Sequence, residues 1–302
     1  MEILKSTTGQ NLIILDVEKF KSGDINIYIN CTFGLSLIFE YCSVFNQFDR
    51  IKFFVGFNED YVKTMRSEEY LKSMEKAFIK QTNDLKNTSF VRNLDLDCIS
   101  PFDLYYFCKS IYVNTGQEIT KKEIFYPKVS EEKILKLERY IVINTKVVLN
   151  SELLFWERNK EKFSKKILDQ KMPIVIIGER VSMKCKEYDL HGAPSFYNEI
   201  LTTFKNVIDL TTESTEDLYD TDIIDRNLNI LRNSSLNVHF GGGGGRIVFG
   251  FMNNTIILSN ENTSFSHSKF SSKYDYIQTN DSNIFFEALD IVLSKCVSSE
   301  FS

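Results

Sequence analysis

The sequence predicts an α/β protein with parallel sheets, and two observations support this fold class. In the second half of the chain, short β-branched apolar runs alternate with helix-like segments, which is typical of strand–helix–strand units around a parallel sheet. The second observation is "NVHFGGGGGRIVFGF" (237–251), which places five consecutive glycines directly after one of these runs in a chain with only 13 glycines. Together they indicate a doubly wound domain with a glycine loop at the end of a strand.

The predicted strands of the second half are continuously apolar, as expected for strands that are covered on both faces. They are Tyr140–Thr145, Pro173–Gly178, Asn206–Thr211, Leu236–Phe240 and Thr255–Ser259. Apolar residues near a 3.6-residue period predict helices between and after them. These are Ser151–Lys171, Asp222–Asn233, Gly244–Asn253 and Asp281–Cys296.

The first half is less regular but has the same character. We expect strands at Asn11–Val17, Ile25–Asn30 and Ile51–Phe57, and helices at Gly34–Phe48 and from Glu59 to about Lys86. The charged segment "PKVSEEKILKLER" (127–139) is interpreted as a linker or a bridging helix. We therefore predict two domains, residues 1–135 and 136–302.

Composition excludes several classes of function. The net charge is −5 and the basic residues are scattered, which argues against a nucleic-acid partner. No apolar run reaches the ~18 residues of a transmembrane helix, and the N-terminus lacks the layout of a signal peptide. The six cysteines form no CxxC pair, so we expect reduced thiols, no metal site and a cytoplasmic protein.

The glycine run predicts a phosphate site because of its position. At the carboxyl edge of a parallel sheet, glycines let the backbone approach a ligand, and the following helix directs free N–H groups at the same place. A tight structural turn and a flexible spacer are the two alternatives. The run does not read GxGxxG after a first strand, and the chain has no GxxxxGK[ST] loop, so neither a dinucleotide site nor a P-loop is expected.

The segment from Tyr140 to Asn260 resembles the donor-binding half of GT-B glycosyltransferases of the heptosyltransferase-like kind. The resemblance lies in the order of "YIVINTKVV", "PIVIIGER", "NVIDLT", "DIIDRNLNILRNSS" and "LNVHFGGGGGRIVFGFMNNTIILS". "NIYINCTFGLSLIFEYCSVF" (26–45) is similar to the first strand, glycine loop and helix of that family. The resemblance to this family implies two Rossmann-like domains that face a cleft.

The resemblance also implies roles for particular residues. Gly241, Gly242, Gly243, Gly244 and Gly245 would line a diphosphate, and Lys146, Arg180 and Arg246 would supply cations. Glu179 would accept hydrogen bonds from a ribose or base, and His191 would touch the sugar or a phosphate. For each side chain, an ordinary surface residue is the alternative.

The expected function is transfer of a sugar from a nucleotide diphosphate sugar to a glycan or lipid-linked acceptor, without metal or other cofactor. Peripheral association with a membrane is left open. The family carries an acid beside its N-terminal glycine loop, but residues 30–35 hold no carboxylate. Glu59 and Asp60, just past a strand, are the candidate bases, and acids at a helix start are the alternative. A non-catalytic nucleotide-sugar or phosphoglycan binding protein and a nucleotide-sugar epimerase are the competing hypotheses.

Overall fold

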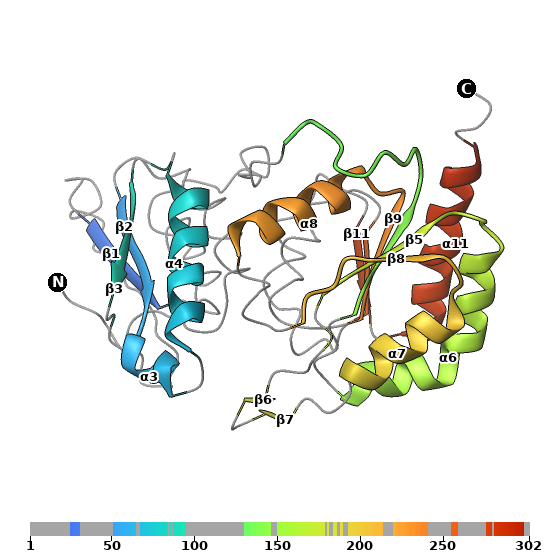
Figure 1. Cartoon of the computed structure of the whole chain (residues 1–302), viewed down its shortest axis with the longest axis horizontal. Coiled ribbons are helices and arrows are strands. Elements are labelled where there is room, and N and C mark those ends of the chain that lie inside the picture. The colour runs from blue at the N-terminus through green and yellow to red at the C-terminus, as the bar shows by residue number, and fades with distance from the viewer. Residues whose placement is uncertain are drawn as a thin grey trace, which may run out of the picture. The chain divides into compact units, whose positions relative to one another are not determined.

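The chain divides into two compact units, Met1–Lys128 and Val129–Ser302, in a computed structural model (Figure 1). The structure describes residues 25–30, 51–64, 67–83, 85, 87–92, 94, 130–145, 150–178, 180, 184–185, 188–189, 193–213, 220–240, 255–258, 276–279 and 281–298. The predicted strand at residues 11–17 and the predicted helices at residues 34–48 and 244–253 lie outside the described residues.

The first unit contains a parallel three-stranded sheet in the order β1-β2-β3. Its strands are β1 (Ile25–Asn30), β2 (Ile51–Phe57) and β3 (Thr88–Arg92). Helices α3 (Glu59–Lys63) and α4 (Glu68–Thr82) connect β2 to β3. Phe78 of α4 packs on Phe90 of β3, with the ring centroids 5.3 Å apart, so α4 covers this sheet.

The prediction of one helix from Glu59 to about Lys86 was wrong, because Ser67 interrupts it. Ser67 has an extended backbone (φ −74°, ψ 164°), and its hydroxyl accepts a hydrogen bond from the Tyr70 N–H at 3.1 Å. A serine in this conformation is a helix N-cap, so α4 begins anew after it.

The second unit is built on a six-stranded parallel sheet in the order β11-β10-β9-β4-β5-β8. The strands are β4 (Ile141–Asn144), β5 (Ile174–Ile177), β8 (Val207–Asp209), β9 (Leu236–Phe240), β10 (Thr255–Leu258) and β11 (Tyr276–Thr279). Numbered along this unit, the order is 6-5-4-1-2-3, the arrangement of dinucleotide-binding Rossmann folds. Every residue of β4, β5, β9 and β10 is buried, as their continuous apolar runs predict.

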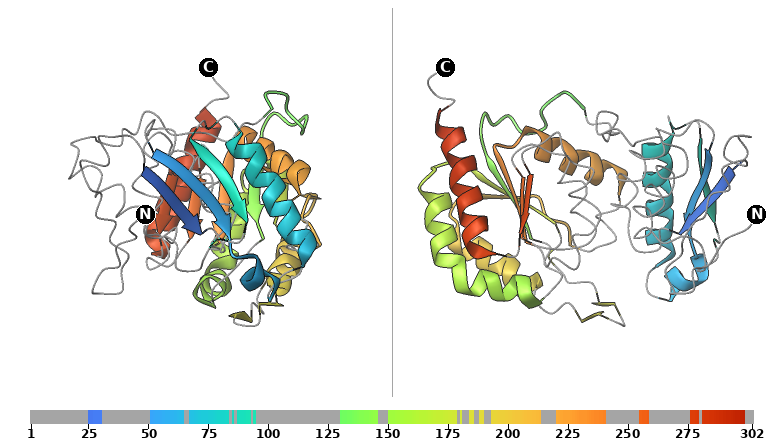
Figure 2. Two further views of the ribbon diagram at one scale, coloured as in Figure 1. Left: turned by 90° about the vertical axis from the view of Figure 1, so that its left-hand side faces the viewer. Right: turned by 180° about the vertical axis from the view of Figure 1, so that it is seen from behind.

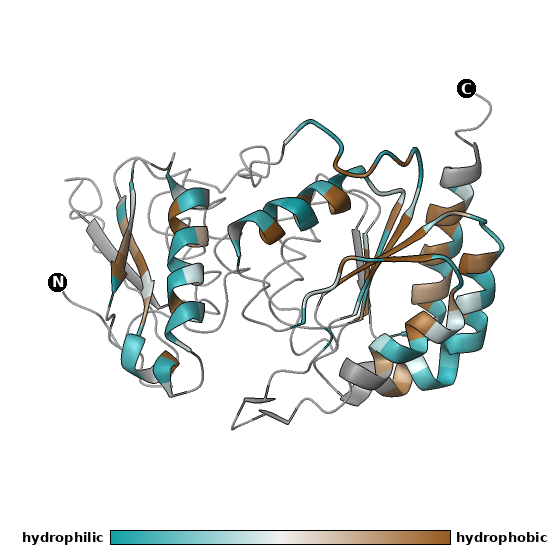
Figure 3. Cartoon of the chain, viewed as in Figure 1, coloured by the Kyte–Doolittle hydropathy of each residue, from teal (hydrophilic) through white to brown (hydrophobic). Residues whose placement is uncertain are grey.

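Helices cover both faces of this sheet (Figures 1 and 2). They are α6 (Asn150–Leu168), α7 (Ala193–Thr203), α8 (Thr221–Asn233) and α11 (Ser282–Ser298). Helices α6, α7 and α11 lie on one face of the sheet, and α8 lies on the other. An aromatic cluster fills the first face, where Trp156, Phe196 and Phe240 meet edge to face at 5.0–5.5 Å. In Figure 3 hydrophobic residues are concentrated in the central strands of this sheet, and hydrophilic residues are prominent on its helices.

The segment that leads into β4 is fixed to α8 and is not helical over residues 130–139. The buried Asn229 side chain donates to the carbonyls of Ser130 (2.9 Å) and Glu132 (2.8 Å) and accepts from the N–H of Ile134 (3.1 Å). One amide thus satisfies three backbone groups of a charged segment. The interpretation of these residues as part of a bridging helix was therefore wrong.

The α/β class with parallel sheets is confirmed by both units. The sequence analysis did not predict five of the described elements: β3, α7, β11 and the antiparallel pair β6 (Lys184–Cys185) and β7 (Tyr188–Asp189). The assignment of an acceptor role to the first domain and a donor role to the second stays a prediction, as does a cleft between them.

Candidate ligand-binding edge of the second unit

The carboxyl edge of the six-stranded sheet is the place where a Rossmann-like domain binds its ligand. In such sheets the ligand lies at the point where the strand order reverses, outside the carboxyl ends of the strands. Here that point falls between β4 and β9, which pair from Ile141↔Leu236 to Asn144↔His239. The last residue of β9 is Phe240, so the glycine run begins directly at this edge.

The end of β4, on the other side of this point, is also well anchored. Thr145 is fully buried, and both its N–H (2.8 Å) and its hydroxyl (3.1 Å) donate to the Ile177 carbonyl of β5. Lys146, the next residue, lies outside the described residues.

A glycine turn places Arg180 after β5. Gly178 has φ 114°, a conformation that side chains rarely adopt, and it is buried. Its carbonyl accepts from the Thr212 N–H at 2.8 Å, and the Arg180 N–H donates to the Thr212 carbonyl at 2.9 Å. These backbone bonds extend the β5–β8 pairing past the strands and fix where the arginine side chain starts.

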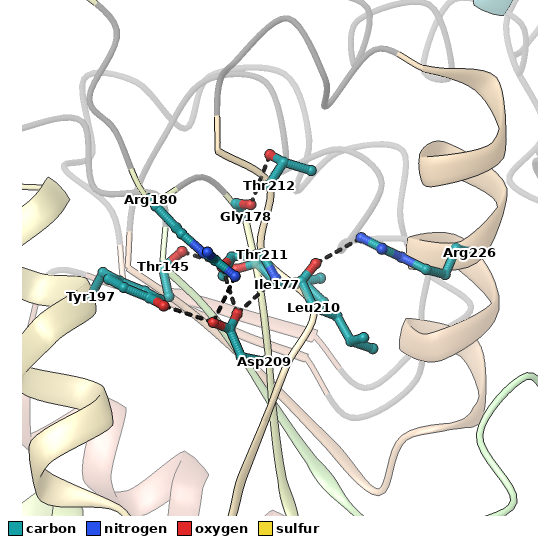
Figure 4. A network of polar contacts seen from close by, with 10 residues as sticks. All are labelled: Thr145, Ile177, Gly178, Arg180, Tyr197, Asp209, Leu210, Thr211, Thr212 and Arg226. Atoms are coloured by element: carbon teal, nitrogen blue, oxygen red, sulfur yellow. Dashed lines mark hydrogen bonds and ion pairs between the residues drawn. The ribbon is translucent and has the colours of Figure 1, made fainter.

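The Arg180 side chain belongs to a polar network over the end of β8 (Figure 4). Its Nη2 donates to Asp209 Oδ2 at 3.0 Å, and its Nε donates to Thr211 Oγ1 at 2.9 Å. Tyr197 of α7 donates its hydroxyl to the same Asp209 oxygen at 2.6 Å. The N–H and hydroxyl of Thr211 donate to Asp209 Oδ1 at 3.0 and 2.5 Å. Asp209 therefore accepts four hydrogen bonds.

The network stabilises the ionised carboxylate. Burial alone would raise the pKa of Asp209, but the hydrogen bonds from Thr211 and Tyr197 and the nearby Arg180 charge leave that pKa below its usual value. Burial, together with the bond to Asp209, raises the pKa of the Tyr197 hydroxyl. A carboxylate and a guanidinium thus lie in direct contact, and their charges largely cancel.

Arg226 of α8 lies on the other side of the same segment (Figure 4). Its Nη2 donates to the Leu210 carbonyl at 2.7 Å, and it also donates to the Asn227 side-chain oxygen. Burial lowers the pKa of this guanidinium. Within the described part of the chain no carboxylate pairs with it, so its role there is to hold the loop after β8.

The two candidate bases lie in the first turn of α3, immediately after β2. Glu59 forms an ion pair with Lys63, one turn later, at 2.7 Å. The hydrogen bond from Lys63 lowers the pKa of Glu59, which makes this carboxylate a weaker proton acceptor. Asp60 is exposed beside it.

The other predicted site residues lie outside the described residues. They are Lys146, Glu179, His191, Gly241, Gly242, Gly243, Gly244, Gly245 and Arg246. Two further residues near this edge have structural roles: His239 is fully buried within β9, and Asp220 caps α8 by accepting from the N–H groups of Asp222 and Ile223.

The sequence analysis missed the partners of Arg180. The sequence does contain a signal for Asp209. This residue follows the apolar pair Val207–Ile208 in "NVIDLT", and Arg180 follows "PIVIIGE". The two side chains can meet because β5 and β8 are neighbouring strands. Tyr197 lies on a helix that was not predicted, and no pattern singled it out.

The described residues contain no cluster of three or more His, Cys, Asp or Glu side chains able to hold a metal ion, and metal independence stays a prediction. No helix in the described ranges has the length and apolarity needed to span a membrane.

Comparison with known proteins gives structural neighbours but no sequence relative. No family model matches the chain, and no curated protein matches it. The structure is similar to ADP-heptose lipopolysaccharide heptosyltransferase II of E. coli, with 11% identity over 90% of this chain and 99% of that one and a TM-score of 0.48.

It is also similar to the iron-containing dodecameric glycosyltransferase TibC of enterotoxigenic E. coli. That match has 10% identity and a TM-score of 0.45, and it covers 78% of this chain and 58% of TibC. The structure of TibC with ADP-D-β-D-heptose gives 10% identity, a TM-score of 0.45, and 80% and 60% coverage. These neighbours are glycosyltransferases.

Proposed function

We propose that the chain is a glycosyltransferase that uses a nucleotide diphosphate sugar as donor. The observation that carries this proposal is the start of the glycine run at the end of β9, beside the reversal of strand order in a 6-5-4-1-2-3 sheet. A phosphate group fits there, because backbone N–H groups of a glycine loop can surround it closely. Lys146, one residue beyond the anchored Thr145, begins at the neighbouring strand end and would add a cation.

The chemistry needs a stabilised leaving group and a proton acceptor. The acceptor hydroxyl attacks the anomeric carbon, the bond from that carbon to the diphosphate oxygen breaks, and the hydroxyl proton passes to a base. Negative charge grows on the departing diphosphate, so N–H groups of residues 241–245 and the ammonium of Lys146 would lower the barrier. Arg246 is a further candidate cation at the same loop.

The base is proposed to be Asp60 rather than Glu59. Glu59 is held by Lys63 at 2.7 Å, and its lowered pKa disfavours proton uptake near neutral pH. Asp60 is exposed and follows the same strand, so it is the better candidate. The acceptor is proposed to be a glycan or a lipid-linked glycan.

A non-catalytic nucleotide-sugar binding protein is the second candidate. Two observations favour it: residues 30–35 hold no carboxylate, and the Glu59 carboxylate is occupied by an ion pair. Such a protein would bind the donor through the same glycine run without turning it over.

A set of radiolabelled nucleotide sugars incubated with the chain and a glycan acceptor extract separates these functions. Label that moves to the acceptor supports a glycosyltransferase, and Asp60→Asn should then reduce the rate at least about a hundredfold if Asp60 is the base. Binding without turnover supports the second candidate, an epimerised donor indicates an epimerase, and no binding of any nucleotide sugar would reject the proposal.

A further inference from the structure

We propose that Arg180 is a specificity-determining residue that contacts the nucleoside end of the bound ligand instead of its diphosphate. This inference rests on the proposed function, and it concerns how the ligand lies along the carboxyl edge of the sheet. It follows from three observations: where the guanidinium lies, which of its N–H groups are in use, and which charge faces it.

The first observation is the position of the guanidinium across the sheet. Arg180 follows β5, but its side chain turns toward β8, where it bonds Asp209 and Thr211. The glycine run begins at β9, and the strand order β9-β4-β5-β8 puts three strand spacings between the two places. Three spacings are about 14 Å, which is much longer than a diphosphate group. A ligand whose diphosphate lies at β9 would reach β5 and β8 with its ribose and base.

The second observation is which hydrogen-bonding groups remain. All four bonds to Asp209 come from protein groups, so this carboxylate has no free capacity for a ligand. Arg180 uses Nε and one N–H of Nη2, and within the described residues nothing bonds its Nη1. The side chain is 38% exposed. The outer edge of this guanidinium thus has no hydrogen-bond partner among the described residues, and it can only donate.

The third observation is the charge. Asp209 Oδ2 lies 3.0 Å from Arg180 Nη2, and the ion pair cancels most of the positive charge that a diphosphate would need. A neutral base with exposed acceptor atoms suits such a group better. The planar guanidinium edge matches two acceptors side by side, as in guanine O6 and N7, and a single keto oxygen of uracil would accept one bond. Adenine offers a donor where these bases offer the keto oxygen, so we expect keto bases to be preferred.

Calorimetric titration with ADP, GDP, UDP and CDP, their nucleosides and inorganic pyrophosphate tests this assignment. Arg180→Met keeps the apolar stem and removes the donors. It should weaken the best nucleoside diphosphate and its nucleoside by the same factor, about tenfold, since one charge-assisted hydrogen bond is lost. Pyrophosphate affinity should stay within about twofold of wild type. In the wild type GDP or UDP should bind more tightly than ADP.

Asp209→Asn should change the affinity for a nucleoside diphosphate in opposite directions, depending on whether Arg180 contacts the nucleoside or the diphosphate. If Arg180 faces the nucleoside, losing the carboxylate that orients it should weaken nucleoside and nucleoside diphosphate alike. If it faces the diphosphate, removing a nearby negative charge should tighten diphosphate binding while leaving the nucleoside unchanged. If Arg180→Met does not fold, Arg180→Lys is used in the same titrations, because it keeps the charge but lacks the planar donor edge.

Two results would overturn the inference while leaving the proposed function intact. One is a loss of diphosphate and pyrophosphate affinity with unchanged nucleoside affinity in Arg180→Met or Arg180→Lys. The other is wild-type affinity for every probe in a folded variant, which would make the network purely structural. A wild-type chain that binds none of the four nucleoside diphosphates would reject the inference and the proposed function together.

Discussion

Asp209 shows how one residue can couple the fold to the proposed site. Its carboxylate accepts four hydrogen bonds from Arg180, Tyr197 and Thr211, and these join the ends of β5 and β8 to α7. Because the pKa of Asp209 is lowered in the folded chain, the folded state binds protons less readily than the unfolded state. The network therefore contributes stability that depends on pH.

The sign of this dependence follows from proton linkage. A depressed carboxyl pKa adds stability above the unfolded value of about 3.9, and this contribution is lost as pH falls below it through the folded pKa. We predict that Asp209→Asn lowers the free energy of unfolding by about 1–3 kcal/mol at neutral pH, because an ionic acceptor of four bonds is lost. Below about pH 4 the difference should shrink. Urea titrations at several pH values measure it, with the exposed Asp169→Asn as the control. A difference that grows toward acid would contradict the account.

Gly56 gives a prediction at the residue scale in the first unit. It pairs with Val91 across β2 and β3, and a Cβ at this position would lie 1.8 Å from the Val91 carbonyl oxygen. Because that contact is with backbone, strand β3 would have to move. We predict that Gly56→Ala destabilises the chain by at least about 1–3 kcal/mol, the usual cost of overpacking. Denaturant unfolding checks this, and Ser89→Ala at an exposed position of β3 should change little. Equal stability of the two variants would mean that the strands lie further apart.

At the element scale, α8 depends on its cap. The Asp220 carboxylate accepts from the N–H groups of Asp222 (2.8 Å) and Ile223 (3.3 Å), which have no partner inside the helix. We predict that Asp220→Ala lowers the free energy of unfolding by about 1 kcal/mol, whereas Asp220→Asn, which is also a good cap, costs much less. Thermal unfolding compares the two. If both variants lost the same stability, the charge of Asp220 and not its cap would be what matters.

The second element-scale prediction concerns Asn229, which anchors the segment leading into β4. Asn229→Leu has a similar size but leaves two carbonyls and one N–H of residues 130–134 without their partner. We predict a loss of about 1–3 kcal/mol, because three hydrogen bonds of about 1 kcal/mol each are lost and the exposed segment regains part of this through water.

Proteolysis gives that variant a local readout. The charged residues Glu131, Lys133 and Lys136 offer cleavage sites within the anchored segment. Cleavage there should be faster in Asn229→Leu, while Asp222→Ala, at an exposed position of the same helix, should be cut as wild type. Wild-type protection of the segment in Asn229→Leu would show that other contacts hold it.

For the whole molecule, the sequence predicted the central strands well because they are apolar on both faces. "YIVINT", "PIVIIG" and "LNVHF" needed no other information. By contrast β11, with the sequence "YIQT", is short and half polar, so no pattern distinguishes it from a loop. The break at Ser67 was missed because charged residues continue across it, and only its extended backbone reveals the new helix.

The candidate site was less predictable, because its contacts join distant residues. Arg180 and Asp209 are separated by 29 residues, and they meet only because β5 and β8 are neighbours in the sheet. The sequence indicated that basic residues follow the ends of several strands. Which neighbouring strand end each basic side chain can contact depends on the order of the strands in the sheet. This order explains why Arg180 bonds Asp209 and Thr211 at the end of β8, a contact that the sequence alone did not indicate.

We propose that a nucleoside diphosphate binds at the carboxyl edge of the second unit with its diphosphate on the glycine run. This binding mode can be tested by a thermal-shift or calorimetric titration of the wild type and of Gly243→Val with four nucleoside diphosphates. At about 100 times its dissociation constant, the preferred diphosphate should stabilise the wild type by roughly 2.7 kcal/mol. The variant should unfold as the wild type does without ligand but should gain almost nothing from the diphosphate. Equal stabilisation of a folded Gly243→Val variant, or no stabilisation of the wild type by any diphosphate, would contradict the account.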